Sequence, residues 1–361
     1  MTMPRTIVPF GPQHPVFPEP IQLKITYEDE KVVDVVPALG YGHRGIEKAC
    51  ELNDFQKNIY LCERICGICS SIHGIAYCEA VERLWPLEIP QRAKYLRTIF
   101  SEMSRVHSHL LWLGLFADAF GFESLFMQFW RIRERVLDMI EMTAGHRVTQ
   151  SVSVIGGVRR DISAEQKSRM LDTFKTVKAE TERLTSVLRK DYTVKARTVG
   201  VGVITTEQAV LFGCVGPVLR GSGVAEDARM QDIMAYKDLE FEPIVEQDGD
   251  SWARCLVRFR ECLQAIDLIV KALNKLPEGE LAVKFKGNPP AGEVSFRHEQ
   301  PRGEMFYYVK GNGTKNLDRV RVRTPTYSNI PSLLLMLPGS SLPDVPIIVH
   351  TIDPCISCTE R

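Results

Sequence analysis

Cys66-Gly-Ile-Cys69 and Cys355-Ile-Ser-Cys358 are two Cys-x-x-Cys pairs, one near each end of the sequence. The three-residue offset lets both sulfur atoms of a pair converge on one point from a single turn of chain. Four thiolates are a ligand set for soft or borderline metals such as zinc, iron and nickel. The pairs therefore predict a metal site that two distant parts of the chain build together.

The separation of the pairs argues against a zinc ribbon. In such sites a short loop joins the two pairs, whereas 285 residues lie between Cys69 and Cys355. A disulfide within either pair is not expected in a cytosolic chain, and a thioredoxin-like motif would need a nearby βαβ pattern, which the sequence lacks. A structural zinc site remains the main alternative to a site in the core.

The composition is that of an ordinary soluble globular protein, with 44% hydrophobic and 25% charged residues among 361. Basic and acidic residues both number 45, so the charge balance gives no sign of a nucleic-acid partner. The start of the chain has no apolar signal region, which predicts a cytoplasmic protein. Its longest apolar runs, 110–117 and 333–337, are far shorter than the about 20 residues that span a bilayer.

Hydrophobic periodicity predicts a mainly helical protein with a small β part, an α+β fold. We expect helices over 46–52, 90–114, 126–143, 163–189 and 251–276, and a shorter one from Thr205. Capping boxes, Ser163-Ala-Glu-Gln166 and Thr205-Thr-Glu-Gln208, open two of them. The expected strands are 21–27 and 31–36, which form a hairpin, and 304–309, 319–323 and 345–350.

These elements predict one domain, 1–361, in which a long-helix bundle, an N-terminal β-hairpin sheet and an irregular C-terminal region surround a central metal site. Its parts are an N-terminal arm and sheet (1–60), a helical core (61–276) and a C-terminal region that returns to the metal site (277–361). Residues 9–20 are rich in proline and should form an extended arm. Cys255 and Cys262 share a face of the last long helix, where buried packing is the expected role.

The stretches Glu63-Arg-Ile-Cys-Gly-Ile-Cys69 and Asp353-Pro-Cys-Ile-Ser-Cys358 resemble the two cysteine motifs of the catalytic large subunit of NiFe hydrogenases. In that family the four cysteines hold nickel, and the second of each pair also bridges to an iron that carries carbon monoxide and cyanide. The resemblance implies that Cys66 and Cys355 are terminal nickel ligands and that Cys69 and Cys358 bridge. Thiolate sulfur is soft and can bridge two metals, which suits this arrangement.

Other segments are also similar to the quinone-pocket subunit of respiratory complex I. They are Gly11-Pro-Gln-His-Pro15, Gly42-His-Arg-Gly-Ile-Glu-Lys48, the helix through 101–109 and Ile155-Gly-Gly-Val158. A short chain with both sets of motifs resembles the membrane-associated, energy-converting hydrogenases of the Ech and CO-induced type.

The resemblance implies two further catalytic residues. Arg302, in Pro301-Arg-Gly303, matches an arginine that lies over the open position of the metal centre, a role suited to a permanently charged, rigid guanidinium. Glu19 matches a glutamate that passes protons to and from a nickel thiolate of Cys66 or Cys355, for which a carboxyl pKa raised by a partly dry site is useful. The alternatives are a surface-turn arginine and a solvated glutamate between two prolines.

Less direct matches concern the surroundings of the metals. Thr324 and Thr326 are candidate hydroxyl donors to a cyanide, and Glu47 matches an acidic ligand of a magnesium or iron ion near the C-terminus. Where the family has a terminal histidine ligand, this chain has Arg361, a cation that cannot coordinate metal. Family precursors usually carry a C-terminal extension that is removed after nickel insertion, so either the gene lacks it or the sequence is the mature form.

Histidines near these motifs are further candidates. His73, four residues after Cys69, could touch the surroundings of the metals. His107 and His109 lie two apart on a helix and cannot share a face, so we expect at most one of them near the metals.

The implied function is the reversible reduction of protons to H2. The partners would be a small hydrogenase subunit with a 4Fe-4S cluster, a ferredoxin-like electron donor, integral membrane subunits that translocate ions, and maturation proteins that install the diatomic ligands. The complex would sit on the cytoplasmic side of the cell membrane. The alternatives are a complex I-like quinone-binding subunit without nickel, in which the cysteine motifs should be missing, and a structural zinc tetrathiolate protein.

Overall fold

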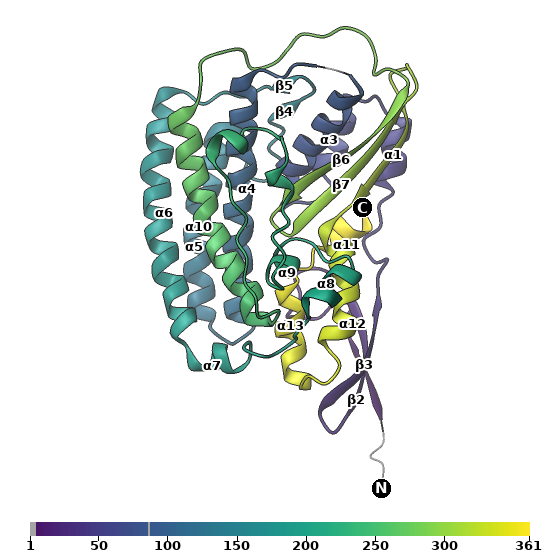
Figure 1. The fold of residues 1–361 in the computed structure, drawn as a ribbon, viewed down its shortest axis with the longest axis vertical. Coiled ribbons are helices and arrows are strands. Elements are labelled where there is room, and N and C mark those ends of the chain that lie inside the picture. Colours follow the sequence, from purple (N-terminus) through teal and green to yellow (C-terminus); the bar gives the residue numbers. More distant parts are fainter. Residues whose placement is uncertain (1–4, 86) are drawn as a thin grey trace.

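A computed structural model describes residues 5–85 and 87–361. Most of the long helices stand side by side on one side of the molecule, and the two three-stranded sheets lie on the other side, together with the helix Ser70–Leu84 (Figure 1). The long helices are α3 (Ser70–Leu84), α4 (Gln91–Asp118), α5 (Glu123–Ala144), α6 (Ala164–Lys190) and α10 (Ser251–Lys275). α4 lies in their midst, where it contacts α3, α5 and α10.

Local sequence signals set where these helices begin and end. Ser163 accepts a hydrogen bond from the backbone N–H of Gln166, and the Gln166 side chain accepts one from the backbone N–H of Ser163, which confirms the predicted capping box. Asp250 caps α10 through the backbone N–H of Ala253. Gly145 ends α5 with φ 85°, a left-handed conformation that glycine adopts readily.

Two antiparallel three-stranded sheets flank the helices within the described residues. The N-terminal sheet contains β1 (Thr6–Phe10), β2 (Gln22–Glu28) and β3 (Lys31–Ala38), and the C-terminal sheet contains β6 (Gly292–Gln300), β7 (Gly303–Gly311) and β8 (Leu317–Arg323). A short ladder pairs β4 (Ser153–Val154) with β5 (Gly157–Val158).

The turn between β6 and β7 is tight and well supported. Gln300 pairs with Gly303, so Pro301 and Arg302 form a two-residue loop. Gly303 has φ 130°, and a Cβ atom there would lie 2.7 Å from the backbone nitrogen of Gly216, so only glycine permits this close approach. The contact fixes the position of Arg302.

Short helices connect the larger elements. They are α1 (Ile46–Leu52), α2 (Asn58–Glu63), α7 (Tyr192–Ala196), α8 (Thr206–Leu211), α9 (Pro217–Arg220), α11 (Pro325–Asn329), α12 (Leu333–Met336), α13 (Val345–Thr351) and α14 (Ile356–Glu360), with 3-10 turns η1 (Ala228–Met230), η2 (Lys237–Leu239), η3 (Ile330–Ser332) and η4 (Leu342–Asp344). The last of these helices, α14, carries the second cysteine pair, whereas the first pair lies in the loop between α2 and α3.

The α+β class and most predicted elements are confirmed, but one assignment is wrong. Residues 345–350, predicted as a strand, belong to helix α13. A short apolar run cannot be assigned by periodicity alone, and Pro346 in the first turn starts the helix. Strands β1 and β6 and the separate helix α3 were not among the predicted elements. The single-domain division at residues 60 and 276 stays a prediction.

The described residues pack into two hydrophobic clusters. The larger one joins the long helices to the C-terminal sheet and includes all four motif cysteines, and the smaller one joins the N-terminal sheet to α13 and its neighbours. None of the described helices combines the length and the apolar character that a membrane span needs.

Candidate metal centre

The two cysteine pairs meet inside the molecule. Cys69 directly precedes α3 and Cys355 directly precedes α14, so each pair lies at the start of a helix. The sulfur atoms of Cys66 and Cys355 are 3.5 Å apart, as are those of Cys69 and Cys358. All four side chains are buried.

This thiol group fits a metal centre. Two sulfur atoms bound at about 2.3 Å to one tetrahedral ion lie roughly 3.8 Å apart, close to the 3.5 Å separations here. Among the described residues, Cys66, Cys69 and Cys358 form the one set of at least three His, Cys, Asp or Glu ligands whose atoms all lie within 4.8 Å of one another. The donor set suits zinc as well as nickel and iron, so it does not by itself select the metal.

The thiols differ in acidity. Burial opposes ionisation of Cys69, but hydrogen bonds from Cys358 and Cys66 lower its pKa to about 6. Burial raises the pKa of Cys358 well above its ordinary value. The protein alone therefore favours a thiolate at Cys69, and a bound cation would be needed to deprotonate Cys358.

Arg302 is held beside the second pair. Its Nε donates to the carbonyl oxygen of Asp353 at 3.1 Å, its guanidinium pairs with the Asp353 carboxylate at 3.2 Å, and its Nη1 donates to Ser108 Oγ at 3.3 Å. Burial opposes the charge, but Asp353 and the thiol of Cys355 raise the pKa of Arg302 well above its ordinary value. Because Arg302 is only 2% exposed, the surface-turn alternative is wrong.

Glu19 reaches the second pair from the N-terminal arm. Its carboxylate accepts hydrogen bonds from Ser357 Oγ at 2.6 Å, from the Ser357 backbone N–H at 3.0 Å and from the Ile356 N–H. Ser357 Oγ in turn lies 3.4 Å from Cys355 Sγ. Burial, and then the negative charge of Cys355, raise the pKa of Glu19. A fully solvated Glu19 is therefore wrong.

The two threonines contact the backbone of the second pair. Thr324 Oγ1 donates to the Cys358 carbonyl at 3.2 Å, whereas Thr326 Oγ1 accepts from the Cys355 N–H at 3.1 Å. The hydroxyl proton of Thr324 is therefore engaged, and that of Thr326 is free to donate to another group. Pro301 lies in the β6–β7 turn next to Arg302.

Glu47 lies on α1 in contact with Arg361. Its carboxylate accepts from Arg361 Nε and from the Val322 N–H, both at 2.9 Å, and from Arg321 at 2.9 Å. Burial opposes ionisation, but the Val322 and Arg361 contacts lower the pKa of Glu47. A guanidinium thus contacts the carboxylate to which the resemblance assigns a metal ion.

Two histidines complete the surroundings of the thiols. His73 Nε2 lies 3.5 Å from Cys358 Sγ, and its Nδ1 lies 2.8 Å from the Tyr307 hydroxyl. Burial lowers the pKa of His73 to about 3, so this ring is neutral. His107 Nε2 lies 3.0 Å from the Ile68 carbonyl, inside the first Cys-x-x-Cys loop. The expected proximity of His73, and of one of His107 and His109, is confirmed.

Other residues of the site were missed by sequence reasoning. Arg44 Nη2 donates to the carbonyls of Ile65 at 2.9 Å and Ser357 at 2.7 Å, so one side chain ties the two cysteine segments together. Asp353 and Ser357 stood inside the quoted motif without an assigned role. Ser108 and Tyr307 carried no signal, because their roles arise from contacts between distant segments.

Buried paired thiols with an arginine and a carboxylate beside them form a candidate metal centre. Two protein families match the chain. The family described as "Respiratory-chain NADH dehydrogenase, 49 Kd subunit" matches residues 119–287 and 282–361, and the family described as "Nickel-dependent hydrogenase" matches residues 44–116. The chain belongs to this family of hydrogenase large subunits and related complex I subunits, which confirms the resemblance.

Individual relatives support this membership. The membrane-bound hydrogenase subunit alpha of Pyrococcus furiosus is 38% identical over 98% of this chain and 87% of its own length. The carbon monoxide-induced hydrogenase of Rhodospirillum rubrum is also 38% identical, over 98% of this chain and 99% of its own length. The solved structure of a membrane-bound sulfane sulfur reductase, an archaeal respiratory membrane complex, contains a chain that is 31% identical and superposes with a TM-score of 0.95. The match covers 99% of this chain and 98% of that one.

Proposed function

We propose that the chain is the catalytic large subunit of a NiFe hydrogenase, which reversibly reduces protons to H2. The observation that carries this proposal is the meeting of both cysteine pairs in one buried group, with Arg302 and Glu19 beside the second pair. The hydrogenase names of the relatives and the nickel-dependent hydrogenase match support it.

In this proposal Cys66, Cys69, Cys355 and Cys358 would hold nickel together with an iron that carries carbon monoxide and cyanide ligands. When bound, this centre supplies the electron-transfer and Lewis-acid chemistry that amino-acid side chains lack. Thr326 Oγ1, which has a free proton, is the better of the two threonine candidates for a cyanide.

The residues of the chain supply the route for protons. The Cys355 thiol contacts Ser357 Oγ, and Ser357 Oγ donates to Glu19 Oε1. A proton on the thiol sulfur can therefore pass to the serine oxygen while the serine proton passes to the carboxylate. The raised pKa of Glu19 brings its carboxyl group closer to neutral pH, as a proton relay requires.

Arg302 provides a fixed positive charge beside the thiols. Asp353 and Ser108 hold three separate parts of the guanidinium, so its orientation is set before any ligand binds. A permanently charged donor group at this position can polarise a small ligand or bind a cyanide. In place of a C-terminal magnesium or iron ion, we propose that the Arg361 guanidinium balances the charge of Glu47.

Electrons and ions pass through partners in this proposal. Among the described residues, the thiol group is the one cysteine cluster that could hold a metal. A small subunit with a 4Fe-4S cluster, supplied by a ferredoxin-like donor, would therefore deliver electrons. The relatives' names include membrane-bound complexes, which supports integral membrane subunits. We further propose that these subunits translocate ions and that the chain lies on the cytoplasmic side of the membrane. Maturation proteins would install the metals.

Infrared spectroscopy with metal analysis on the purified complex tests the proposal. We expect carbonyl and cyanide stretches together with one nickel per chain. Zinc in the thiol group and no such stretches would contradict it and favour a structural zinc site. A quinone-binding subunit would have no use for the four thiols, and a complex that reduces sulfur or quinone but evolves no H2 would contradict the assigned reaction.

A further inference from the structure

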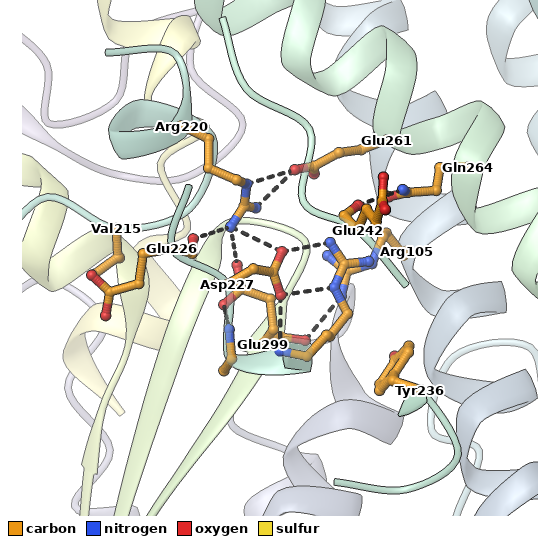
Figure 2. Close-up of polar contacts among 12 residues, drawn as sticks. Arg105, Val215, Arg220, Glu226, Asp227, Tyr236, Glu242, Glu261, Gln264 and Glu299 are labelled. Carbon is orange, nitrogen blue, oxygen red and sulfur yellow. Dashed lines mark hydrogen bonds and ion pairs between the residues drawn. The ribbon is translucent and has the colours of Figure 1, made fainter. Parts of the chain in front are cut away.

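A buried group of carboxylates and guanidiniums lies between α4, α9, α10 and the end of β6 (Figure 2). Arg220 is at its centre, with nitrogen–oxygen distances of 2.8 Å to Glu261, 2.9 Å to Glu299 and 3.0 Å to Asp227. We call this group the Arg220 network. Its members are Glu102, Arg105, Arg220, Asp227, Arg229, Glu261 and Glu299, all at most 4% exposed.

The Arg220 network contains more acids than bases. Among its described members, four carboxylates face three guanidiniums. His109 contacts Glu261 at 3.2 Å, but burial lowers the pKa of this histidine and favours the neutral ring. Arg258, the next guanidinium, has Asp353 and, more weakly, Glu261 among its charged neighbours, but it forms no ion pair with a carboxylate of the described residues. Because an uncompensated buried charge is costly, one carboxyl group of the network is favoured to bind a proton.

That carboxyl group is Glu299. Burial opposes the ionisation of Glu102, Asp227 and Glu261, but the neighbouring arginines lower the pKa of each. At Glu299, burial and then the negative charge of Asp227 raise the pKa to about 7.

The groups around Glu299 come from several elements. Positive charge comes from Arg220 on α9, Arg229 on η1 and Arg105 on α4. The backbone N–H of Ala228 donates to its carboxylate at 3.2 Å. Asp227, in the segment before η1, is the one negative group among the strongest charged neighbours of Glu299.

A cavity borders Glu299. The cavity has a volume of about 240 Å³, and its charged lining groups besides Glu299 are Glu226, Asp227, Arg297, Glu304 and Arg323. The side chains of Glu226 and Arg297 are 61% and 52% exposed, so the cavity opens to the surface. Glu299 therefore belongs to the buried network on one side and reaches the cavity on the other.

Rigid elements connect Glu299 to the metal centre. Glu299 stands three residues before Arg302, on the strand whose tight turn holds that arginine. Arg105 Nη2 donates to the Glu299 carbonyl at 3.0 Å, and Arg105 lies one helical turn before Ser108, which contacts Arg302. A change of charge at Glu299 therefore occurs only three residues from Arg302, the arginine beside the thiols.

Resting on the proposed function, we propose that Glu299 is a proton-binding site that exchanges protons with solvent through this cavity and balances negative charge added at the metal centre. In the step, the carboxylate takes one proton from a hydronium ion of the solvent, which becomes water, and turns into a neutral carboxylic acid. One O–H bond breaks in the donor and one forms on the carboxyl group, and no electron passes through Glu299. Glu299 acts through Arg302 and the surrounding charges, so it is a positioning residue.

Infrared difference spectroscopy on the assembled complex, titrated with acid and base, tests this proposal. With glutamate labelled by ¹³C at the side-chain carboxyl, we expect a carboxylic-acid stretch that shifts with the label and titrates close to pH 7. Glu299→Gln should remove this band. The matched control, Glu226→Gln, alters an exposed carboxyl of the same cavity and should leave the band unchanged. The frequencies of the carbonyl and cyanide stretches should lose one pH-dependent step in Glu299→Gln and keep it in Glu226→Gln.

The labelled wild-type complex can overturn the proposal even if Glu299→Gln fails to fold. Absence of a glutamate band that titrates between pH 5 and 9 would do so, as would metal-centre stretches with the same pH dependence in Glu299→Gln and wild type. In a sample without carbonyl and cyanide stretches, a titrating glutamate band that Glu299→Gln removes would support the proton site and contradict only the proposed hydrogenase function.

Discussion

The metal centre and the Arg220 network both bury ionisable groups, but they balance charge in different ways. In the network, arginines on α4, α9 and η1 neutralise most of the carboxylates directly. At the metal centre the nearest neighbours of the thiols include other thiols, and burial raises the pKa of Cys358 well above its ordinary value. The network is largely complete without a ligand, whereas the thiol group needs an added cation to become fully ionised. Disrupting each region should therefore have a different consequence.

Removal of one thiol should have the largest effect. Cys66→Ala deletes one of the four sulfur atoms, so we expect loss of bound nickel and of all H2 evolution by the assembled complex, while the chain remains folded. Metal analysis and a hydrogen-evolution assay measure this. Cys262→Ala is the matched control, because Cys262 is also buried but lies on α10 within the helical core. Full nickel content in Cys66→Ala would refute the four-thiol site.

Removal of the central arginine should act on stability. Arg220→Ala leaves Asp227, Glu261 and Glu299 without their shared partner, and we expect a loss of about 3–5 kcal/mol in the free energy of unfolding. Urea unfolding of the purified chain measures it. Arg297→Ala, in a half-exposed ion pair with Glu304, should cost below about 1 kcal/mol. Equal losses in both variants would remove the distinction between the network and surface ion pairs.

The pH dependence of stability should sharpen the role of Glu299. Its pKa is raised to about 7 in the folded chain, so between roughly pH 4.5 and 7 the folded state binds more protons than the unfolded state. Stability should therefore fall as the pH rises through this window, by at most roughly 3 kcal/mol. In Glu299→Gln this part of the decline should disappear. Parallel unfolding curves of wild type and variant across the window would count against the raised pKa.

Replacement of Arg302 by lysine should have the smallest effect on the free energy of unfolding, but it should clearly lower the rate of H2 evolution. Lysine keeps the charge but cannot make the separate guanidinium contacts with Asp353 and Ser108. We expect nickel to be retained and H2 evolution to fall by about 100-fold. Arg361→Lys, at the Glu47 contact, should leave the rate nearly unchanged. An unaltered rate in Arg302→Lys would exclude the proposed role.

Several features could be predicted because their causes are local or highly specific. The capping box at Ser163 depends on residues three apart, and the hairpin of β2 and β3 follows from two β-rich runs around a short turn. The α13 helix could not be distinguished from a strand, because its apolar run is short and contacts with other parts of the fold decide its conformation.

The paired cysteines illustrate what the sequence by itself determined. Their spacing predicted a thiol site shared by the two ends of the chain, and the resemblance identified Arg302 and Glu19 as its neighbours. The contact of Ser357 with both Glu19 and Cys355 became visible only in the structure. A spacing rule reports which ligands can converge, but not which side chains from other elements will meet them.

The Arg220 network was decided by tertiary structure alone. Its members extend from residue 102 to residue 299, and nothing in the sequence pattern assigned any of them to a buried group of charges. Only packing of α4, α9, α10 and β6 removes them from water together (Figure 2). Their energies depend on burial and on mutual distance, and neither quantity can be read from residue order.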